Sequence, residues 1–257
     1  MTAIERIFIL DGGLAKVKDG SIYSPGVNVG VPMTLSCNAY LIRHKGSWLL
    51  WDTGSDDDLV SEPDGRIIAH GILGIVRKTV ASQLEEIGVG PDDIETLAIS
   101  HAHFDHVGNC RLFRKARWIA QRAEYNAMFG ANPEEFGYSP ELYATLRQNA
   151  IELVDGDHDI FGDGAVRLIF TPGHTLGHCS LLVRLPETGP VLLSGDVAHN
   201  RENFRLRRVP SFNADQRATT ASMDKVEELL RAEQATMWVN HDTAQSDSLP
   251  HAPTWIV

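Results

Sequence analysis

The sequence has only three cysteines in 257 residues: Cys37, Cys110 and Cys179. They are scattered, odd in number and without C-x-x-C spacing, which argues against a disulfide framework and against a thiolate zinc site. Such sparse usage is typical of a reducing compartment, so we expect a cytoplasmic protein. No apolar run approaches the ~20 residues of a membrane span. The first residues, MTAIERIFILDGG, lack the basic start and long apolar stretch of a signal peptide and predict a strand.

The protein is also short of positive charge. Lysine plus arginine number 23 against 34 for aspartate plus glutamate, a formal net charge of -11. This balance disfavours binding to the phosphate backbone of nucleic acids or to an anionic membrane. It says nothing about a small-molecule substrate, and no pattern in the sequence predicts an oligomeric state.

The sequence does contain enough apolar residues, 43% of the total, to build a core. No linker, low-complexity tract or repeat divides it, so we expect one domain over residues 1–257. Predicted strands are Ile4–Asp11, Asn38–His44, Trp48–Thr53, Thr96–Ser100, Arg117–Gln121, Val166–Thr171, Cys179–Leu185, Val191–Ser194 and Met237–Asn240. Predicted helices are Lys78–Ile87, Ala123–Phe129, Ser139–Asn149 and Asp215–Glu233. The mixture predicts an α/β fold with several antiparallel hairpins.

Clusters of polar residues directly follow several of these predicted strands. They are Asp52–Gly54, His101–His106, Gly173–His174, Gly195–Asp196 and Asn240–Asp242. Loops that follow the strands of a rigid sheet commonly carry the chemistry of α/β enzymes. The repeated placement therefore predicts one functional site at these strand ends.

The segment His101–His106 carries the strongest chemical signal. Its three histidines and one aspartate are bunched titratable groups, which are costly unless they are paired or bind a metal. In an extended chain, residues two apart point to the same side, so His101, His103 and Asp105 can converge. A turn at Asp105 and His106 would aim successive side chains at two neighbouring points. Imidazole and carboxylate are ligands that zinc accepts.

Three later residues, His174, Asp196 and His241, can supply the further metal ligands that this segment alone does not contain. Taken alone, a histidine after a strand is usually an ordinary polar residue, and a Gly-Asp pair is usually a turn. In order behind His101–His106, they complete a set that ordinary packing does not explain. The sequence therefore predicts a metal centre.

The pattern H-x-H-x-D-H, the segment Thr171–His178, the pair Gly195-Asp196 and the late His241 resemble the metallo-β-lactamase superfamily. The resemblance extends over nearly the whole chain. It implies a four-layer αβ/βα sandwich with two divalent metal ions, zinc favoured, at one edge between two sheets. The implied ligands are His101, His103 and His174 for one ion, and Asp105, His106 and His241 for the other, with Asp196 bridging.

Within that superfamily the sequence is most similar to the N-acyl homoserine lactonases, through Ser100–His106, Thr171–His178 and Arg201–Phe204. The resemblance implies a lactone as the small-molecule substrate. These lactonases usually carry a tyrosine three residues after the bridging aspartate, placed to contact the substrate carbonyl. In this sequence that position is His199, which we expect to donate the hydrogen bond instead.

The resemblance also implies a mechanism, in which a hydroxide bridging the two metals attacks the lactone carbonyl. One metal would polarise the carbonyl oxygen, assisted by His199. Asp105 would pass the proton of the hydroxide to the leaving ring oxygen. Asp52 and His178 are expected to orient ligands without binding metal. The histidines outside the motif are expected at the surface; they are His44, His70, His158 and His251.

Other hydrolases are alternatives, because the same ligands fit another lactone or ester, such as 4-pyridoxolactone, and a thioester as in glyoxalase II. A thioesterase of that type would need a C-terminal helical region, and few residues follow His241. A β-lactamase ranks lower, since such enzymes are exported and lack the bridging Asp196 in this setting. An iron oxidoreductase would need a flavin domain. A non-catalytic metal-binding module would be expected to have lost a ligand.

Three segments between the motifs are candidates for substrate selection: Ser55–Arg77, Phe129–Tyr138 and Asn203–Phe212. The first holds an acidic run followed by six aliphatic residues between Ile67 and Val76. It predicts either the lining of an acyl-chain pocket or a helix packed on the core.

Overall fold

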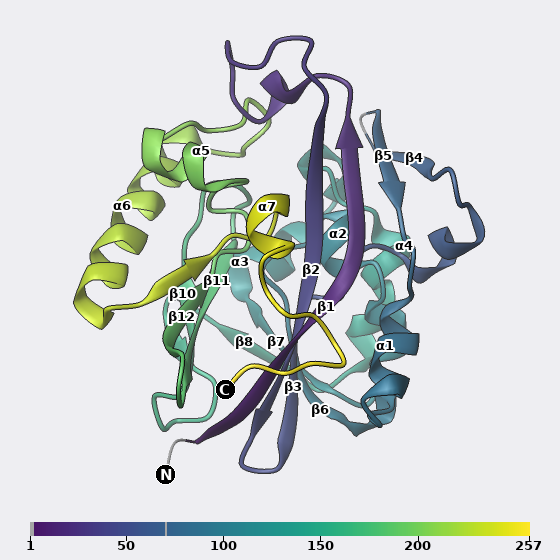
Figure 1. The fold of residues 1–257 in the computed structure, drawn as a ribbon, viewed down its shortest axis with the longest axis vertical. Coiled ribbons are helices and arrows are strands. Elements are labelled where there is room, and N and C mark those ends of the chain that lie inside the picture. Colours follow the sequence, from purple (N-terminus) through teal and green to yellow (C-terminus); the bar gives the residue numbers. More distant parts are fainter. Residues whose placement is uncertain (1–2, 70) are drawn as a thin grey trace.

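The computed structural model describes residues 3–69 and 71–257, and two β-sheets form its centre (Figure 1). Within the described residues, the larger sheet has the strand order β4-β5-β1-β2-β3-β6-β7-β8 and the smaller has the order β13-β12-β11-β10-β9. The larger sheet consists of β1 (Ile4–Val17), β2 (Met33–His44), β3 (Ser47–Trp51), β4 (Arg66–Ala69), β5 (Ile72–Ile75), β6 (Ile94–Ala98), β7 (Arg117–Gln121) and β8 (Ile151–Val154). The smaller sheet consists of β9 (His158–Asp159), β10 (Val166–Phe170), β11 (Cys179–Leu185), β12 (Gly189–Leu193) and β13 (Thr236–Trp238).

Helices cover the outer faces of both sheets (Figure 1). The α-helices are α1 (Val80–Glu86), α2 (Phe104–Val107), α3 (Arg122–Met128), α4 (Pro140–Tyr143), α5 (Arg201–Leu206), α6 (Gln216–Glu233) and α7 (Thr243–Ser246). Short 3-10 helices occur at η1 (Gly20–Ile22), η2 (Asp57–Ser61), η3 (Pro91–Asp93), η4 (Cys110–Leu112), η5 (Pro133–Phe136) and η6 (Ala144–Gln148). No described helix combines the length and apolar character that crossing a membrane requires.

Side-chain alternation along the strands produces four layers. In β11, Leu181 faces the core between the two sheets, whereas its neighbour Leu182 faces α6. In β12, Leu193 and Leu192 divide in the same way. Successive strand residues point to opposite faces, so each sheet buries one face on the other sheet and one on helices. The expected αβ/βα sandwich is confirmed.

All nine predicted strands are present, but the first two are longer than predicted. Strand β1 continues to Val17 and β2 begins at Met33, and they pair antiparallel along most of their length. Strand β1 does not end at the two glycines that follow Asp11. The chain continues in the same strand with a register shift between Asp11 and Leu14. The resulting hairpin carries the loop at residues 18–32 beyond the body of the sheet (Figure 1).

The helix considered for Ser55–Arg77 is wrong. Within this segment, strands β4 and β5 pair as an antiparallel hairpin, and β5 also pairs with β1. The isoleucines of the segment favour strands because their branched side chains pack on a pleated surface. Gly74 has no side chain where one would overlap that of Ile68, so the hairpin can close.

The helix predicted at Ser139–Asn149 divides into α4 and the 3-10 helix η6. Its buried residues are Tyr143, Leu146 and Asn149, at intervals of three. That spacing matches the three residues per turn of a 3-10 helix better than the 3.6 of an α-helix. Ser139 is the N-cap residue of α4 and Pro140 its first helical residue, although Ser139 forms no side-chain capping hydrogen bond.

Candidate metal centre

The structure brings the seven candidate ligands together where several strands end. His101 and His103 follow β6, Asp105 and His106 lie in α2, and the other three follow β10, β12 and β13; these are His174, Asp196 and His241. All seven are buried except His103, which is half-buried. Helix α2 begins directly after His103. The chain therefore turns directly after His103, earlier than predicted, so Asp105 lies with His241 and does not converge with His101 and His103.

Asp196 lies at the centre of this group, and its two carboxylate oxygens face different histidines. Oδ2 lies 3.3 Å from His174 Nε2 and 3.8 Å from His101 Nε2. Oδ1 lies 3.2 Å from His106 Nε2 and 3.0 Å from His241 Nε2. One carboxylate thus stands between two sets of imidazoles, the geometry required of a ligand shared by two metal ions.

The first set consists of three histidines whose ring nitrogens converge. His103 Nδ1 lies 2.8 Å from His101 Nε2 and 2.9 Å from His174 Nε2. In the second set, Asp105 Oδ1 lies 3.8 Å from His106 Nε2 and Asp105 Oδ2 lies 3.7 Å from His241 Nε2. Nitrogen and carboxylate oxygen at these separations suit a zinc-like divalent ion.

In three of these histidines, the ring nitrogen that points away from the cluster, here called the outward nitrogen, lies close to an oxygen acceptor. The other ring nitrogen, which points into the cluster, is called the inward nitrogen. His241 Nδ1 lies 2.6 Å from the carbonyl oxygen of Ser36, and His103 Nε2 lies 3.0 Å from that of Phe136. His174 Nδ1 lies 2.9 Å from Asn213 Oδ1. A carbonyl oxygen can only accept, so each outward nitrogen carries the proton. In the neutral imidazole the inward nitrogen then carries a lone pair, the form in which histidine binds a metal.

The inward atoms fit a pair of divalent cations. His106 Nε2 and Asp196 Oδ1 are fully buried and have no hydrogen-bond partner among the described residues. The inward nitrogens of His103 and His174 present lone pairs to each other at 2.9 Å. Unsatisfied buried polar atoms are costly, and facing lone pairs repel. A cation between them would satisfy both.

Burial lowers the pKa of the histidines in the first set, whereas nearby carboxylates raise the pKa of His106 in the second set. Burial lowers the pKa of His101, His103 and His174, so these imidazoles are neutral at neutral pH and ready to bind a metal. Burial also acts to lower the pKa of His106, but the charges of Asp196, Asp52 and Asp105 outweigh it and raise that pKa to about 10. The three carboxylates therefore favour a positive charge at His106, which belongs to the second set.

Asp52 and His178 contact the ligands as the sequence predicts. Asp52 Oδ2 lies 2.8 Å from His106 Nδ1, and Asp52 adopts a left-handed φ of 59° that places it there. His178 Nε2 accepts a hydrogen bond from the backbone N–H of Asp196 at 2.7 Å. Gly195, with a φ of 51°, allows this approach, because a Cβ there would lie 2.6 Å from His178 Nε2.

Glu124 supports two of the loops that carry candidate ligands, and no sequence motif marks it. Its buried carboxylate accepts hydrogen bonds from the backbone N–H groups of Ala102 and Gly177, each at 2.9 Å. The hydroxyls of Tyr138 and Thr175 each donate to it at 2.7 Å. Glu124 therefore joins the loop of His101 to the loop of His174.

His199 lies inside the same cluster. It is buried, its Nε2 is 3.2 Å from Asp196 Oδ2, and its ring stacks on that of His241. His174, Asp196 and His199 offer ligand atoms close enough to hold one ion, so His199 is also a candidate ligand. Its Nδ1 is buried and has no partner among the described residues.

Cys37 is a second residue that sequence reasoning missed. Its Sγ lies 3.5 Å from Asp105 Oδ2, and Cys37, Asp105 and His241 form a further candidate ligand group. Burial and the charge of Asp105 raise the pKa of this thiol to about 12. No sequence motif marks it, because it lies within β2, far along the chain from both partners.

The other described histidines belong to none of the candidate ligand groups. His44 is not at the surface as predicted: it is buried, stacks on Phe161 and lies 3.0 Å from Asp163. His158 and His251 are half-buried, and His70 lies outside the described residues.

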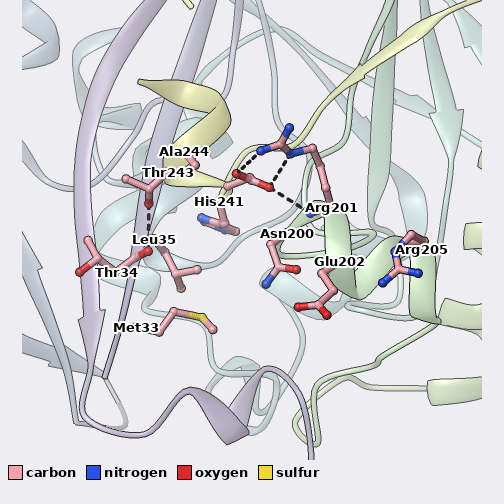
Figure 2. A pocket seen from close by; sticks show the side chains of 11 residues that line it. Met33, Thr34, Leu35, Asn200, Arg201, Glu202, Arg205, His241, Thr243 and Ala244 are labelled. Atoms are coloured by element: carbon pink, nitrogen blue, oxygen red, sulfur yellow. Dashed lines mark hydrogen bonds and ion pairs between the residues drawn. The ribbon is translucent and has the colours of Figure 1, made fainter. Parts of the chain in front are cut away.

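A cavity of about 570 Å³ opens beside the cluster. In Figure 2, His241 lies between Thr34 and Leu35 of β2 on one side and Asn200 and Glu202 on the other. Arg201 also lines the cavity and is held by an ion pair with Asp242 at 2.8 Å. A space of this size beside the candidate ligands can hold a small molecule.

Known proteins resemble the chain over its whole length. The model of the Metallo-beta-lactamase superfamily matches residues 33–236. The N-acyl homoserine lactonase AttM of Azorhizobium caulinodans is 30% identical, over 96% of this chain and 97% of its own. AiiA, the N-acyl homoserine lactonase of Bacillus thuringiensis subsp. kurstaki, is 28% identical over 98% and 99%. A solved structure of an N-acyl homoserine lactone hydrolase, with the product N-hexanoyl-L-homoserine bound at its catalytic metal center, superposes with a TM-score of 0.86 at 27% identity and full coverage of both chains.

Proposed function

Because the chain belongs to the metallo-β-lactamase superfamily, we propose that it is a metal-dependent hydrolase that opens the lactone ring of N-acyl homoserine lactones. The observation that carries the proposal is the position of Asp196, with each carboxylate oxygen facing a different set of histidines. The high overall likeness to lactonases directs the choice of substrate.

The proposed site holds two divalent ions, with zinc as the metal. One ion would be bound by His101, His103 and His174, the other by Asp105, His106 and His241, and Asp196 would be shared. When bound, such ions supply Lewis acidity and lower the pKa of water to about 7.

The chain's own residues then position the reactants and move one proton. Asp105 accepts the proton of the attacking water at a carboxylate oxygen as the water oxygen bonds to the carbonyl carbon. It delivers this proton to the ring oxygen as the ring C–O bond breaks, which yields an acyl homoserine. His199 donates a hydrogen bond to the carbonyl oxygen on which charge develops. The cavity beside His241 receives part of the substrate.

The experiment that tests this proposal combines a substrate panel with elemental analysis. The purified enzyme is assayed with an N-acyl homoserine lactone, 4-pyridoxolactone, a glutathione thioester and a β-lactam. We expect the acyl homoserine lactone to give the highest kcat/KM and the protein to contain two metal ions per chain. Faster hydrolysis of the thioester or β-lactam would reject the substrate assignment. Full activity with a single ion would reject the shared role of Asp196.

His199 provides a narrower test of the substrate assignment. His199→Ala is expected to lower kcat/KM for lactones by roughly 10- to 100-fold, in line with the loss of a hydrogen bond to a developing charge. Both metal ions should remain, since each already has three other protein ligands and a share of Asp196. His158→Ala, a half-buried histidine away from the site, is the matched control. Loss of one ion in His199→Ala would instead identify His199 as a ligand, and unchanged kinetics would remove it from the chemistry.

Two broader proposals accompany the function. Residues 1–257 are proposed to form one domain, which the core cluster shared by both sheets supports. A cytoplasmic location is proposed from the three cysteines, which are buried and form no disulfide.

A further inference from the structure

Tyr23 lies directly after η1, on the loop between β1 and β2, and is fixed there by α5. Its carbonyl oxygen accepts a hydrogen bond from Asn203 Nδ2 at 3.0 Å. The next residue, Ser24, donates its hydroxyl to Asn203 Oδ1 at 2.7 Å. Asn203 is itself buried in α5, the helix that begins two residues after His199. The backbone of this loop is therefore anchored to the segment that carries His199.

The ring of Tyr23 is buried against the candidate metal centre. Only 4% of the residue is exposed. Its ring centroid lies 4.6 Å from that of His199 and 5.6 Å from that of Phe212, the latter at an edge-on angle of 83°. Tyr23 also belongs to the apolar cluster that contains Cys37 and Phe104, the neighbours of Asp105. The ring thus lies between His199 and the elements that carry Asp105.

The hydroxyl of Tyr23 forms no hydrogen bond with another described residue, and its oxygen is not one of the fully buried polar atoms that lack a partner, so it keeps some access to solvent. Burial raises the pKa of Tyr23 well above its ordinary value, and the charges of Asp105 and Asp196 raise it further. The phenol is therefore protonated at neutral pH. Its ring packs against that of His199, which lies 3.2 Å from Asp196, so the phenol has a proton to donate beside the candidate metal centre.

We propose that Tyr23 contacts the substrate, and that its hydroxyl donates a hydrogen bond to the ring oxygen of the bound lactone. This inference rests on the proposed lactonase function. Cys37, which belongs to the same apolar cluster as Tyr23, lies 3.5 Å from Asp105, and Asp105 is the group that hands its proton to the ring oxygen. His199 and Tyr23 then divide the two ester oxygens: the histidine faces the carbonyl oxygen and the tyrosine faces the leaving oxygen. The phenol ring packs against both Phe212 and His199, whose rings also contact each other.

Tyr23→Phe tests the inference, because it removes one oxygen and keeps the ring. In the zinc-loaded enzyme we expect kcat for an N-acyl homoserine lactone to fall by about 10-fold or more, with KM nearly unchanged, since the lost bond strengthens as charge develops on the leaving oxygen. Metal content and thermal unfolding should match the parent. Tyr125→Phe is the control, because Tyr125 packs against Trp118 and Phe129 on the outer face of the larger sheet.

A thiolactone substrate identifies the oxygen involved. Replacing the ring oxygen by sulfur removes a good hydrogen-bond acceptor, so the loss caused by Tyr23→Phe should shrink on the acyl homocysteine thiolactone. An equal loss on both substrates would overturn the assignment to the ring oxygen. Parent-like kcat on the lactone, or a lower unfolding temperature that accounts for the whole loss, would overturn the contact itself.

Binding of the ring-opened product separates this inference from the proposed function. Calorimetric titration with N-hexanoyl-L-homoserine should give a Kd about 2- to 10-fold weaker for Tyr23→Phe than for the parent, the effect of one neutral hydrogen bond. A parent that hydrolyses no lactone would reject the proposed function. A parent that hydrolyses the lactone and binds the product no better than Tyr23→Phe would reject the role of Tyr23 alone.

Discussion

Asp105→Asn is expected to lower kcat by about 10²-fold or more, because the amide keeps an oxygen ligand but can no longer accept and deliver a proton. Asp105 faces both His106 and His241 and lies 3.5 Å from the Cys37 thiol. Steady-state kinetics on an N-acyl homoserine lactone measures the effect. Elemental analysis of the same sample shows whether both ions remain.

The control for this prediction is Asp92→Asn. Asp92 is exposed, pairs with Lys115 and lies at the end of β6 opposite His101. The same chemical change there should leave kcat unaltered. Near-parental turnover in Asp105→Asn with both ions bound would remove Asp105 from proton transfer. A loss of turnover that tracks the loss of one ion would make it a ligand only.

The second large effect is expected for Asp196→Ala. Loss of a partner that merely orients a metal ligand costs about 10- to 100-fold in metal affinity, so loss of the shared carboxylate should cost more than 100-fold. The variant also leaves the inward nitrogens of four histidines without their common anion. We expect fewer than two ions per chain after dialysis and turnover near background.

Dialysis against a weak chelator, followed by elemental analysis and assay, checks this result. Asp224→Ala is the control, since Asp224 is exposed on α6 and pairs only with Arg207 among the described residues. Two tightly held ions in Asp196→Ala would show that the two sites do not depend on a shared carboxylate, and the dinuclear proposal would then fail.

The candidate ligands could be read from the sequence because their residue types are costly in any other arrangement. Three histidines and an aspartate in His101–His106 need a partner, and the later His174, Asp196 and His241 each follow a strand. Strand ends at one edge of a sandwich meet in space, so order along the chain was enough to group them. The regular alternation of apolar residues likewise predicted the central strands.

Residues without a local pattern could not be found in this way. Tyr23 and Cys37 reach the site only because β1 and β2 form a long hairpin, and nothing near either residue signals that length. In the sequence, Glu124 looks like any acidic residue in the first turn of a helix. Only the fold shows that two backbone N–H groups donate hydrogen bonds to it. The hairpin of β4 and β5 was missed because short aliphatic runs fit a helix and a strand equally well.

The outward partners of the candidate ligand histidines have a consequence for which metal the site would take. Ser36, Phe136 and Asn213 fix the rings of His241, His103 and His174 through the polypeptide alone. The donors are therefore assembled by folding, and an incoming ion has little reorganisation to drive. Imidazole and carboxylate donors suit several first-row divalent ions, whose general affinity rises from manganese to copper and falls again at zinc. A donor set of this kind would leave the choice of ion to its geometry and to the supply of each metal in the cell, and not to raw affinity alone.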